Sequence, residues 1–166
     1  MIANVAALAE VCRKARLAVI HVWYVVEPGA PELKQNARLF VDVRNAAANV
    51  RGTWGAAPVD GLEPLEGDFV VEKVRMNAFY GTKLDALLDG LAIDTVIVAG
   101  AWTNMSIEHT ARHAADAGYR VIVVSDGTST LNVEWQEAAL KYALTQVATI
   151  ATCAEVASSF PPRSEP

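Results

Sequence analysis

The clearest indication of the fold is the stretch Thr95–Arg112, TVIVAGAWTNMSIEHTAR. It starts as a continuous apolar, β-branched run, turns at Gly100, and continues with a pattern typical of a helix. A buried strand, a tight turn and a helix in this order form the repeating unit of parallel α/β proteins. Ser106 falls in the first helical turn, where unpaired backbone N–H groups and the helix dipole favour an anion. Its hydroxyl is therefore a candidate nucleophile, and the alternative is that Thr103, Asn104 or Ser106 only caps the helix.

The same alternation of strand and helix continues on both sides of this stretch. Strands are predicted at Leu17–Val26, Phe69–Glu72, Thr95–Ala99, Val121–Val124 and Ala148–Ala151. Helices are predicted at Ile2–Lys14, Gly81–Asp89, Asn104–Ala117 and Val133–Leu144, with a weaker helical pattern at Ala37–Val50. This order predicts an α/β fold of the three-layer α/β/α type. Helices cover both faces of a Rossmann-like, mostly parallel sheet of about five strands. One domain is expected over residues 1–160, followed by a disordered tail at residues 161–166.

Composition excludes several classes of protein. The 166 residues are 52% hydrophobic and 20% charged, which excludes disorder for most of the chain. The net charge is −5 and Lys and Arg form no run, so neither nucleic acids nor membranes are expected partners. We expect neither a signal peptide nor a membrane span. Cys12 and Cys153 are interpreted as buried free thiols, so we expect a cytoplasmic protein that acts on a small molecule.

Lys73 is the second candidate for chemistry. It ends the predicted strand FVVEK, and in open α/β sheets ligands bind outside the carboxyl ends of the strands. A lysine there stabilises negative charge or, with a pKa lowered by burial, deprotonates Ser106. The alternative interpretation is a solvated lysine at a strand end.

Three histidines are weaker candidates. His21 is the only ionisable residue of the Leu17–Val26 strand, where it is either a core histidine with one hydrogen-bond partner or a residue of the pocket. His109 and His113 are four residues apart, a spacing that two zinc ligands can use. Because no third ligand follows at a suitable spacing, we interpret them as surface or interface residues and expect no metal and no other cofactor.

Several segments together resemble the isochorismatase-like (cysteine hydrolase) family. They are FVVEKVRMNAFYGT at Phe69–Thr82, GAWTNMS at Gly100–Ser106 with Thr110 and Arg112 after it, and GYRVIVVSD at Gly118–Asp126. The match runs from the first predicted helix nearly to the C-terminus. The resemblance implies hydrolysis of carbon–nitrogen bonds in small amides by an Asp, Lys and Cys triad through a thioester. Lys73 matches the lysine of that triad.

The resemblance also implies roles for the turn after the Thr95–Ala99 strand. Ser106 stands where the amidase members have their nucleophilic cysteine, and a hydroxyl needs a stronger base than a thiol. The family carries a cis peptide bond in this turn, which here is Ala101–Trp102. The backbone N–H groups of Trp102 and Ser106 are then expected at the oxyanion. We assign substrate binding to a set of four residues: Trp102, Thr103, Phe79 and His21.

The largest departure from the family is its opening strand, an apolar run that ends in an aspartate. No such strand precedes Ile2. In the family the sheet order resembles 3-2-1-4-5-6, so the missing strand lies between those that are here Leu17–Val26 and Thr95–Ala99. Each unpaired buried backbone group costs about 1 to 3 kcal/mol, so we expect the two flanking strands to pair directly or another chain to fill the space. The triad carboxylate is missing too, and Glu27, Glu72 and Asp126 do not occupy its position.

These observations leave two classes of function open. The first is a hydrolase of a small-molecule amide or a related C–N bond, with Ser106 as nucleophile and Lys73 as base or charge stabiliser. A version without a covalent nucleophile also exists in the family, but it relies on the missing aspartate. The second is a catalytically impaired or inactive protein of this fold with a binding or structural role. A third interpretation of the departures is that the natural N-terminus is longer. The family and the long Pro- and Gly-containing segment Glu27–Gly67 also predict a homo-oligomer.

Overall fold

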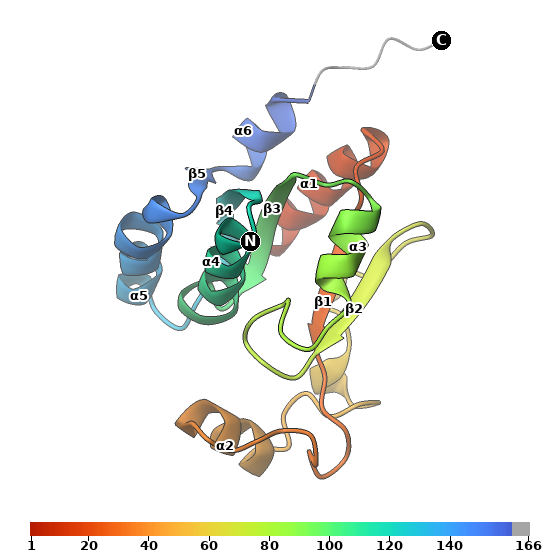
Figure 1. Cartoon of the computed structure of the whole chain (residues 1–166), viewed down its shortest axis with the longest axis vertical. Coiled ribbons are helices and arrows are strands. Elements are labelled where there is room, and N and C mark those ends of the chain that lie inside the picture. Colours follow the sequence, from red (N-terminus) through yellow and green to blue (C-terminus); the bar gives the residue numbers. More distant parts are fainter. Residues whose placement is uncertain (161–166) are drawn as a thin grey trace.

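The computed structural model describes residues 1–160, and the expected tail at residues 161–166 lies outside the described part. The strands are β1 (Ile20–Tyr24), β2 (Phe69–Lys73), β3 (Thr95–Ala101), β4 (Arg120–Ser129) and β5 (Thr149–Ala151). The α-helices are α1 (Ile2–Lys14), α2 (Arg38–Asn45), α3 (Leu84–Gly90), α4 (Glu108–Asp116), α5 (Val133–Ala138) and α6 (Cys153–Ser158). The short helical turns are η1 (Trp54–Ala56), η2 (Thr103–Ile107), η3 (Ala139–Ala143) and η4 (Leu144–Gln146). Figure 1 shows their arrangement along the chain.

All pairs of strands are parallel, but they form two separate sheets. β1 pairs with β2 from Ile20 opposite Phe69 to Tyr24 opposite Lys73. β3, β4 and β5 form the second sheet, in that order. Of the two alternatives expected for the strands on either side of the missing one, direct pairing is wrong, because β1 and β3 belong to different sheets. The expected five parallel strands of an α/β fold are confirmed.

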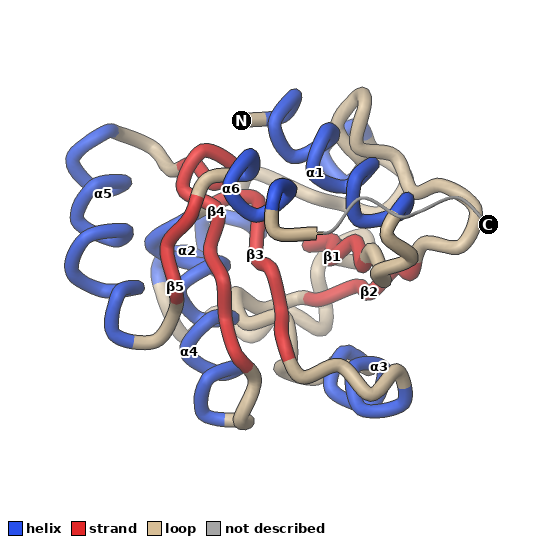
Figure 2. The backbone as a smooth tube through the Cα atoms, turned by 90° about the horizontal axis from the view of Figure 1, so that it is seen from above, coloured by secondary structure: helices blue, strands red, loops and turns tan. Residues whose placement is uncertain are grey.

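Helices cover both faces of the strands, as predicted. Leu8 and Cys12 of α1 pack with Val156 of α6 and with Val124 of β4. Val123, the preceding residue of β4, packs into the opposite cluster, which contains residues of α3 and α4. Successive side chains of a strand point to opposite faces, so one strand contributes to both cores. Figure 2 shows α1 and α6 on one side of β3 and β4, with α4 on the other.

The helix that carries Ser106 differs in detail from the prediction. Residues Thr103–Ile107 form a π-helical turn before α4 begins, with the Ile107 N–H donating to the Trp102 carbonyl five residues earlier at 3.2 Å. The predicted strand Val121–Val124 also extends to Ser129. Its register against β3 shifts between Val98 and Gly100, a local irregularity that periodicity does not reveal.

The segment Glu27–Gly67 has a small core of its own. Val26, Ala30, Leu33 and Phe40 form a buried cluster, and the Arg75 guanidinium lies 4.1 Å from the centre of the Phe40 ring. α2 lies at the lower end of the molecule in Figure 1. The segment is thus packed against the chain that follows β2.

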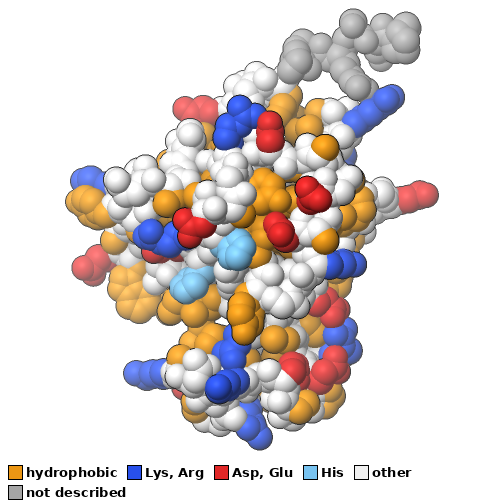
Figure 3. Space-filling model, viewed as in Figure 1, with side chains coloured by type: hydrophobic (Ala, Val, Ile, Leu, Met, Phe, Trp, Pro, Cys, Tyr) orange, Lys and Arg blue, Asp and Glu red, His pale blue; other side chains and the backbone are white. Residues whose placement is uncertain are grey.

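The surface and the thiols agree with the composition. Cys12 and Cys153 are both free and buried, as predicted. On the face shown in Figure 3, Lys and Arg side chains lie scattered among Asp and Glu side chains. None of the helices in residues 1–160 has both the length and the apolar character that crossing a bilayer requires.

Candidate functional site

Lys73 and Ser106 are in direct contact, as the hydrolase hypothesis requires. The Lys73 ammonium donates hydrogen bonds to the Ser106 Oγ and, at 2.5 Å, to the Met76 carbonyl. The Ser106 hydroxyl donates to the same Met76 carbonyl at 3.0 Å. Lys73 is the last residue of β2, and Ser106 lies in the turn after β3. The carboxyl ends of these strands therefore bring together residues that are 33 positions apart.

Burial changes the acid–base chemistry of Lys73. The residue is only 6% exposed, so the solvated-lysine interpretation is wrong. Removal from water disfavours the ammonium form and lowers the pKa of Lys73 from 10.5 to about 8. The Lys73 Nζ lies 5.8 Å from the centroid of the Tyr24 ring. A substantial fraction of Lys73 is thus neutral at mildly alkaline pH and able to accept a proton.

In the described part of the chain, no carboxylate is paired with Lys73. Glu27 and Glu72 both bind the Arg51 guanidinium, at 2.7 and 2.6 Å. Asp126 instead accepts from the Cys153 backbone N–H at 2.7 Å and from the Asn4 side chain at 3.0 Å. The structure therefore places all three acidic candidates in other interactions.

The four residues assigned to substrate binding occupy different environments. Trp102 is 39% exposed and follows a cis peptide bond from Ala101, as the resemblance implies. Phe79 is buried and stacks on the His113 ring, with the centroids 4.5 Å apart. Thr103 is fully buried, and its hydroxyl donates to the Gln136 side chain at 2.6 Å. Trp102 thus precedes the turn that holds Ser106 and remains open to solvent, whereas the Thr103 hydroxyl is already bonded within the protein.

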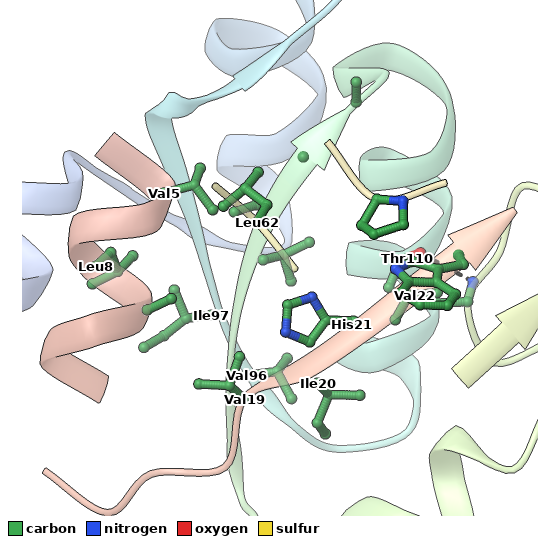
Figure 4. Close-up of a pocket in the computed structure, with 18 of the residues that line it drawn as sticks. Val5, Leu8, Val19, Ile20, His21, Val22, Leu62, Val96, Ile97 and Thr110 are labelled. Carbon is green, nitrogen blue, oxygen red and sulfur yellow. Dashed lines mark hydrogen bonds between the residues drawn. The ribbon is translucent and has the colours of Figure 1, made fainter. Parts of the chain in front are cut away.

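His21 belongs to a separate cluster on β1. Its Nε2 lies 3.0 Å from an Asp68 oxygen, and Arg13 binds both oxygens of the same carboxylate at 3.0 and 2.6 Å. The Arg13 guanidinium holds the pKa of Asp68 far below its usual range, against the opposing effect of burial. His21 also lines a cavity of about 670 Å³ between β1 and β3, seen in Figure 4. His21 thus has the hydrogen-bond partner that the core interpretation expects, and it borders a cavity whose wall includes neither Lys73 nor Ser106.

The other histidine pair is not part of a metal site in residues 1–160, where no group of three potential ligands is found. His113 is hydrogen-bonded to Asn77 at 3.1 Å, and His109 to the Met105 carbonyl at 2.8 Å.

Sequence reasoning missed two parts of this region. The backbone carbonyl of Met76 accepts hydrogen bonds from both Lys73 and Ser106. Every residue has such a carbonyl, so the sequence does not indicate this contact. Asp68 lies just before β2 in a segment without periodicity. The available signal for Asp68 was an acidic residue directly before the predicted strand Phe69–Glu72.

Comparisons with known proteins identify the family of the chain. The isochorismatase domain profile matches residues 1–155. Ureidoacrylate amidohydrolase RutB of Rhizobium rhizogenes is 30% identical over 177 residues, which cover 96% of this chain and 72% of that protein. The isochorismatase family protein YwoC of Bacillus subtilis is 38% identical over 98 residues, which cover 55% of this chain and 52% of YwoC. The chain spans half or less of the length of several curated relatives, as with 41% for RutB of Methylobacterium radiotolerans.

Solved structures show the same fold. An isochorismatase-like hydrolase from Alkaliphilus metalliredigens superposes with a TM-score of 0.83 at 29% identity, covering 96% of this chain and 84% of that one. N-carbamoylsarcosine amidase from Thermoplasma acidophilum gives a TM-score of 0.74 at 29% identity, covering 92% and 82%. Together with the match over residues 1–155, these likenesses show that the chain belongs to the isochorismatase family.

Proposed function

We propose that this chain hydrolyses a carbon–nitrogen bond of a small amide or carbamoyl compound, with Ser106 as nucleophile and Lys73 as its base. The hydrogen bond from buried Lys73 to the Ser106 Oγ carries the proposal, because a nucleophile and its base must lie within hydrogen-bond reach. The names of two relatives, a ureidoacrylate amidohydrolase and an N-carbamoylsarcosine amidase, support this class of substrate.

The reaction follows from the positions of these groups. Neutral Lys73 takes the proton of the Ser106 hydroxyl while Oγ forms a bond to the substrate carbonyl carbon. Backbone N–H groups of Trp102 and Ser106 stabilise the negative oxygen, as donors fixed in place do without reorganisation. The carbon–nitrogen bond then breaks, and the Lys73 ammonium returns the proton to the leaving nitrogen. Water, deprotonated by Lys73, then attacks the ester carbonyl carbon. The carbon–Oγ bond breaks, and the Lys73 ammonium returns the proton to the Ser106 Oγ.

The Met76 carbonyl has a defined part in this reaction. It accepts from both Lys73 and Ser106, so it fixes the two side chains relative to each other. The Ser106 proton must leave this carbonyl and turn toward Lys73 before attack. The carbonyl continues to hold the lysine during that change.

The pH dependence of the rate tests the role of Lys73 as a base. Because the pKa of Lys73 is lowered to about 8, kcat/KM should rise about tenfold per pH unit below pH 8 and level off above it. Ammonia release from ureidoacrylate and N-carbamoylsarcosine between pH 5.5 and 9.5 measures the profile. A rate that falls through pH 8 would instead assign Lys73 to charge stabilisation as an ammonium ion.

Substitution of Ser106 tests covalent catalysis. Ser106→Ala should lower kcat by about a thousandfold, since only binding and the oxyanion donors remain. Ser106→Cys should retain activity and accumulate an acyl-enzyme in a quenched mass measurement, because a thiol ionises more easily. Ser158→Ala, an exposed hydroxyl on α6, is the matched control and should not change the rate. Unchanged hydrolysis by Ser106→Ala would remove the covalent mechanism.

The alternative is a binding protein of this fold without hydrolytic activity. The absence of a carboxylate partner for Lys73 within residues 1–160 favours it, because a carboxylate would help to hold the lysine and its charge. Substrate analogues that bind without ammonia release at any pH would support this second function.

Self-association is the remaining proposal for the intact protein. Several large apolar side chains around α5 are exposed: Leu131, Val133, Trp135 and Tyr142. Exposed apolar patches of this kind often lie in interfaces. Light scattering should give the mass of a dimer or a larger homo-oligomer, and a monomer at high protein concentration would contradict this expectation.

A further inference from the structure

The turn that contains the Met76 carbonyl lies against the helix that follows Ser106. This carbonyl accepts hydrogen bonds from both Lys73 and Ser106, and it belongs to the connection between β2 and α3. Because the peptide unit is planar, the direction of a backbone carbonyl is set by the conformation of the residues beside it. The contacts of residues 77–79 therefore determine where the shared acceptor of Lys73 and Ser106 lies.

Three residues of the helical segment formed by η2 and α4 lie in one row. Ser106, Thr110 and His113 are four and three residues apart, a spacing that places side chains next to one another on the same side of a helix. All three contact the turn after β2, and the Ser106 hydroxyl does so through Met76. The helix that begins beside the proposed nucleophile therefore also binds the turn that orients it.

Thr110 provides the more protected of the two remaining contacts. Its Oγ1 accepts from the Ala78 N–H at 3.1 Å, and Ala78 is only 3% exposed. The Asn77 side chain bonds the His113 ring at the same distance, but His113 is exposed, so water competes for that bond. A buried backbone N–H requires an acceptor, and within residues 1–160 the Thr110 hydroxyl is the acceptor of the Ala78 N–H. Thr110 thus fixes the backbone two residues after Met76.

The turn is held by bonds of its own between Met76 and α3. The Asn77 side chain accepts from the Phe79 N–H at 2.9 Å, and the Ala78 carbonyl accepts from the Thr82 hydroxyl at 2.6 Å. Side-chain hydrogen bonds of this kind restrict the conformation of a turn. A displacement of Ala78 therefore also moves Met76.

We propose that Thr110 is a positioning residue of the proposed active site. By accepting from the Ala78 N–H, it holds the Met76 carbonyl in the place where that carbonyl aligns Lys73 with Ser106. Thr110 itself transfers no proton. The inference rests on the proposed roles of Lys73 and Ser106 in hydrolysis.

Valine in place of Thr110 tests this role, because it keeps the shape of the side chain and removes the acceptor. Thr110→Val should lower kcat about tenfold and leave KM within about twofold, since small displacements of reacting groups reduce rates by such factors. Thr110→Ser keeps a hydroxyl and should restore most of the rate. The matched control is Thr145→Val, which removes an exposed hydroxyl of η4 bonded to the Lys141 carbonyl and should not change the rate.

A double-mutant cycle separates alignment from general destabilisation. In the Lys73→Met background no amine remains to be aligned, so Thr110→Val should leave the residual rate unchanged. A residue with only a structural role would lower the rate by the same factor in both backgrounds. Circular dichroism checks that the variants fold. If Thr110→Val does not fold, Thr110→Ala replaces it with the same expectations, because alanine has a higher helix propensity than valine.

Titration of Lys73 tests the positioning without any reaction. Burial lowers the pKa of the Lys73 amine to about 8, and NMR of isotope-labelled lysine follows this titration, with Lys73→Met identifying the signal. When Thr110→Val releases the turn, water should reach the amine, so its pKa should rise toward 10.5 by about half a pH unit or more. Thr145→Val should leave the pKa of Lys73 unchanged.

Two results would overturn the proposal. The first is that Thr110→Val leaves both kcat and the pKa of Lys73 unchanged. The second is a loss of rate by the same factor with and without Lys73. If the unmodified protein releases no ammonia from any amide tested, the proposed hydrolysis fails separately. The titration of Lys73 in Thr110→Val and Thr145→Val then decides by itself whether Thr110 positions the lysine.

Discussion

Replacing Lys73 with methionine should lower hydrolysis by about a thousandfold and also make the protein more stable at pH 7. The loss of rate follows because the proposed base disappears while the oxyanion donors remain. The stability increases because burial of the Lys73 ammonium destabilises the folded protein, as its pKa of about 8 instead of 10.5 indicates. One pKa unit corresponds to about 1.4 kcal/mol, so the upper bound is about 3 kcal/mol, less the lost hydrogen bonds to Met76 and Ser106.

The size of this gain in stability depends on pH. Between pH 8 and 10.5 the unfolded chain binds the Lys73 proton more strongly than the folded one, so this residue makes the free energy of unfolding rise with pH. Urea unfolding of both proteins at pH 7 and pH 10 should show the advantage of Lys73→Met shrinking toward pH 10. Lys34→Met, an exposed lysine, is the control. Retained activity would eliminate Lys73 as base, and a less stable variant would contradict the desolvation argument.

Asp68→Ala should cause the largest loss of stability, about 3 kcal/mol. Its carboxylate is nearly fully buried and is bound by both Arg13 nitrogens, by His21 and by the Leu65 N–H. Removal of one partner of such a pair leaves the other charge uncompensated. Partial exposure of Arg13 reduces the cost, because water reaches its guanidinium.

Acidic pH should reduce the difference in stability between the unmodified protein and Asp68→Ala. The pKa of Asp68 is depressed in the folded state, so its contribution is complete above the unfolded pKa of about 4 and is lost as pH falls below it. Urea unfolding at pH 7 and pH 3 measures this change. Asp94→Ala removes a carboxylate from an exposed pair with Arg120 and should have little effect at either pH. Equal losses for the two variants would show that burial of Asp68 does not determine its importance.

Much of the fold could be predicted because periodicity reports which faces are buried. The runs in β1 and β3 and the helical spacing of α1 each indicated an element that the structure contains. The division of the strands into two separate sheets could not be predicted from the same signals. Helices packed on both faces hold each strand in place, and closing the space would move β1 by about one strand spacing of 4.8 Å and break those contacts. Local sequence patterns do not show whether keeping these helix contacts is more favourable than pairing β1 with β3.

The candidate site was predictable in part for a related reason. Lys73 and Ser106 stand at strand ends, where topology alone predicts convergence. The Met76 carbonyl and Asp68 depend on the path of irregular backbone, which side-chain patterns do not encode.

The division into two sheets places Lys73 and Ser106 on different parts of the framework. Lys73 belongs to β2 of the smaller sheet, whereas Ser106 follows β3 of the larger one. No ladder of strand hydrogen bonds connects these halves in residues 1–160, so the relative position of the proposed base and nucleophile is set by helix packing and by the Met76 carbonyl. A displacement of the β1–β2 sheet relative to the β3–β4–β5 sheet would therefore directly change the distance between the Lys73 amine and the Ser106 Oγ.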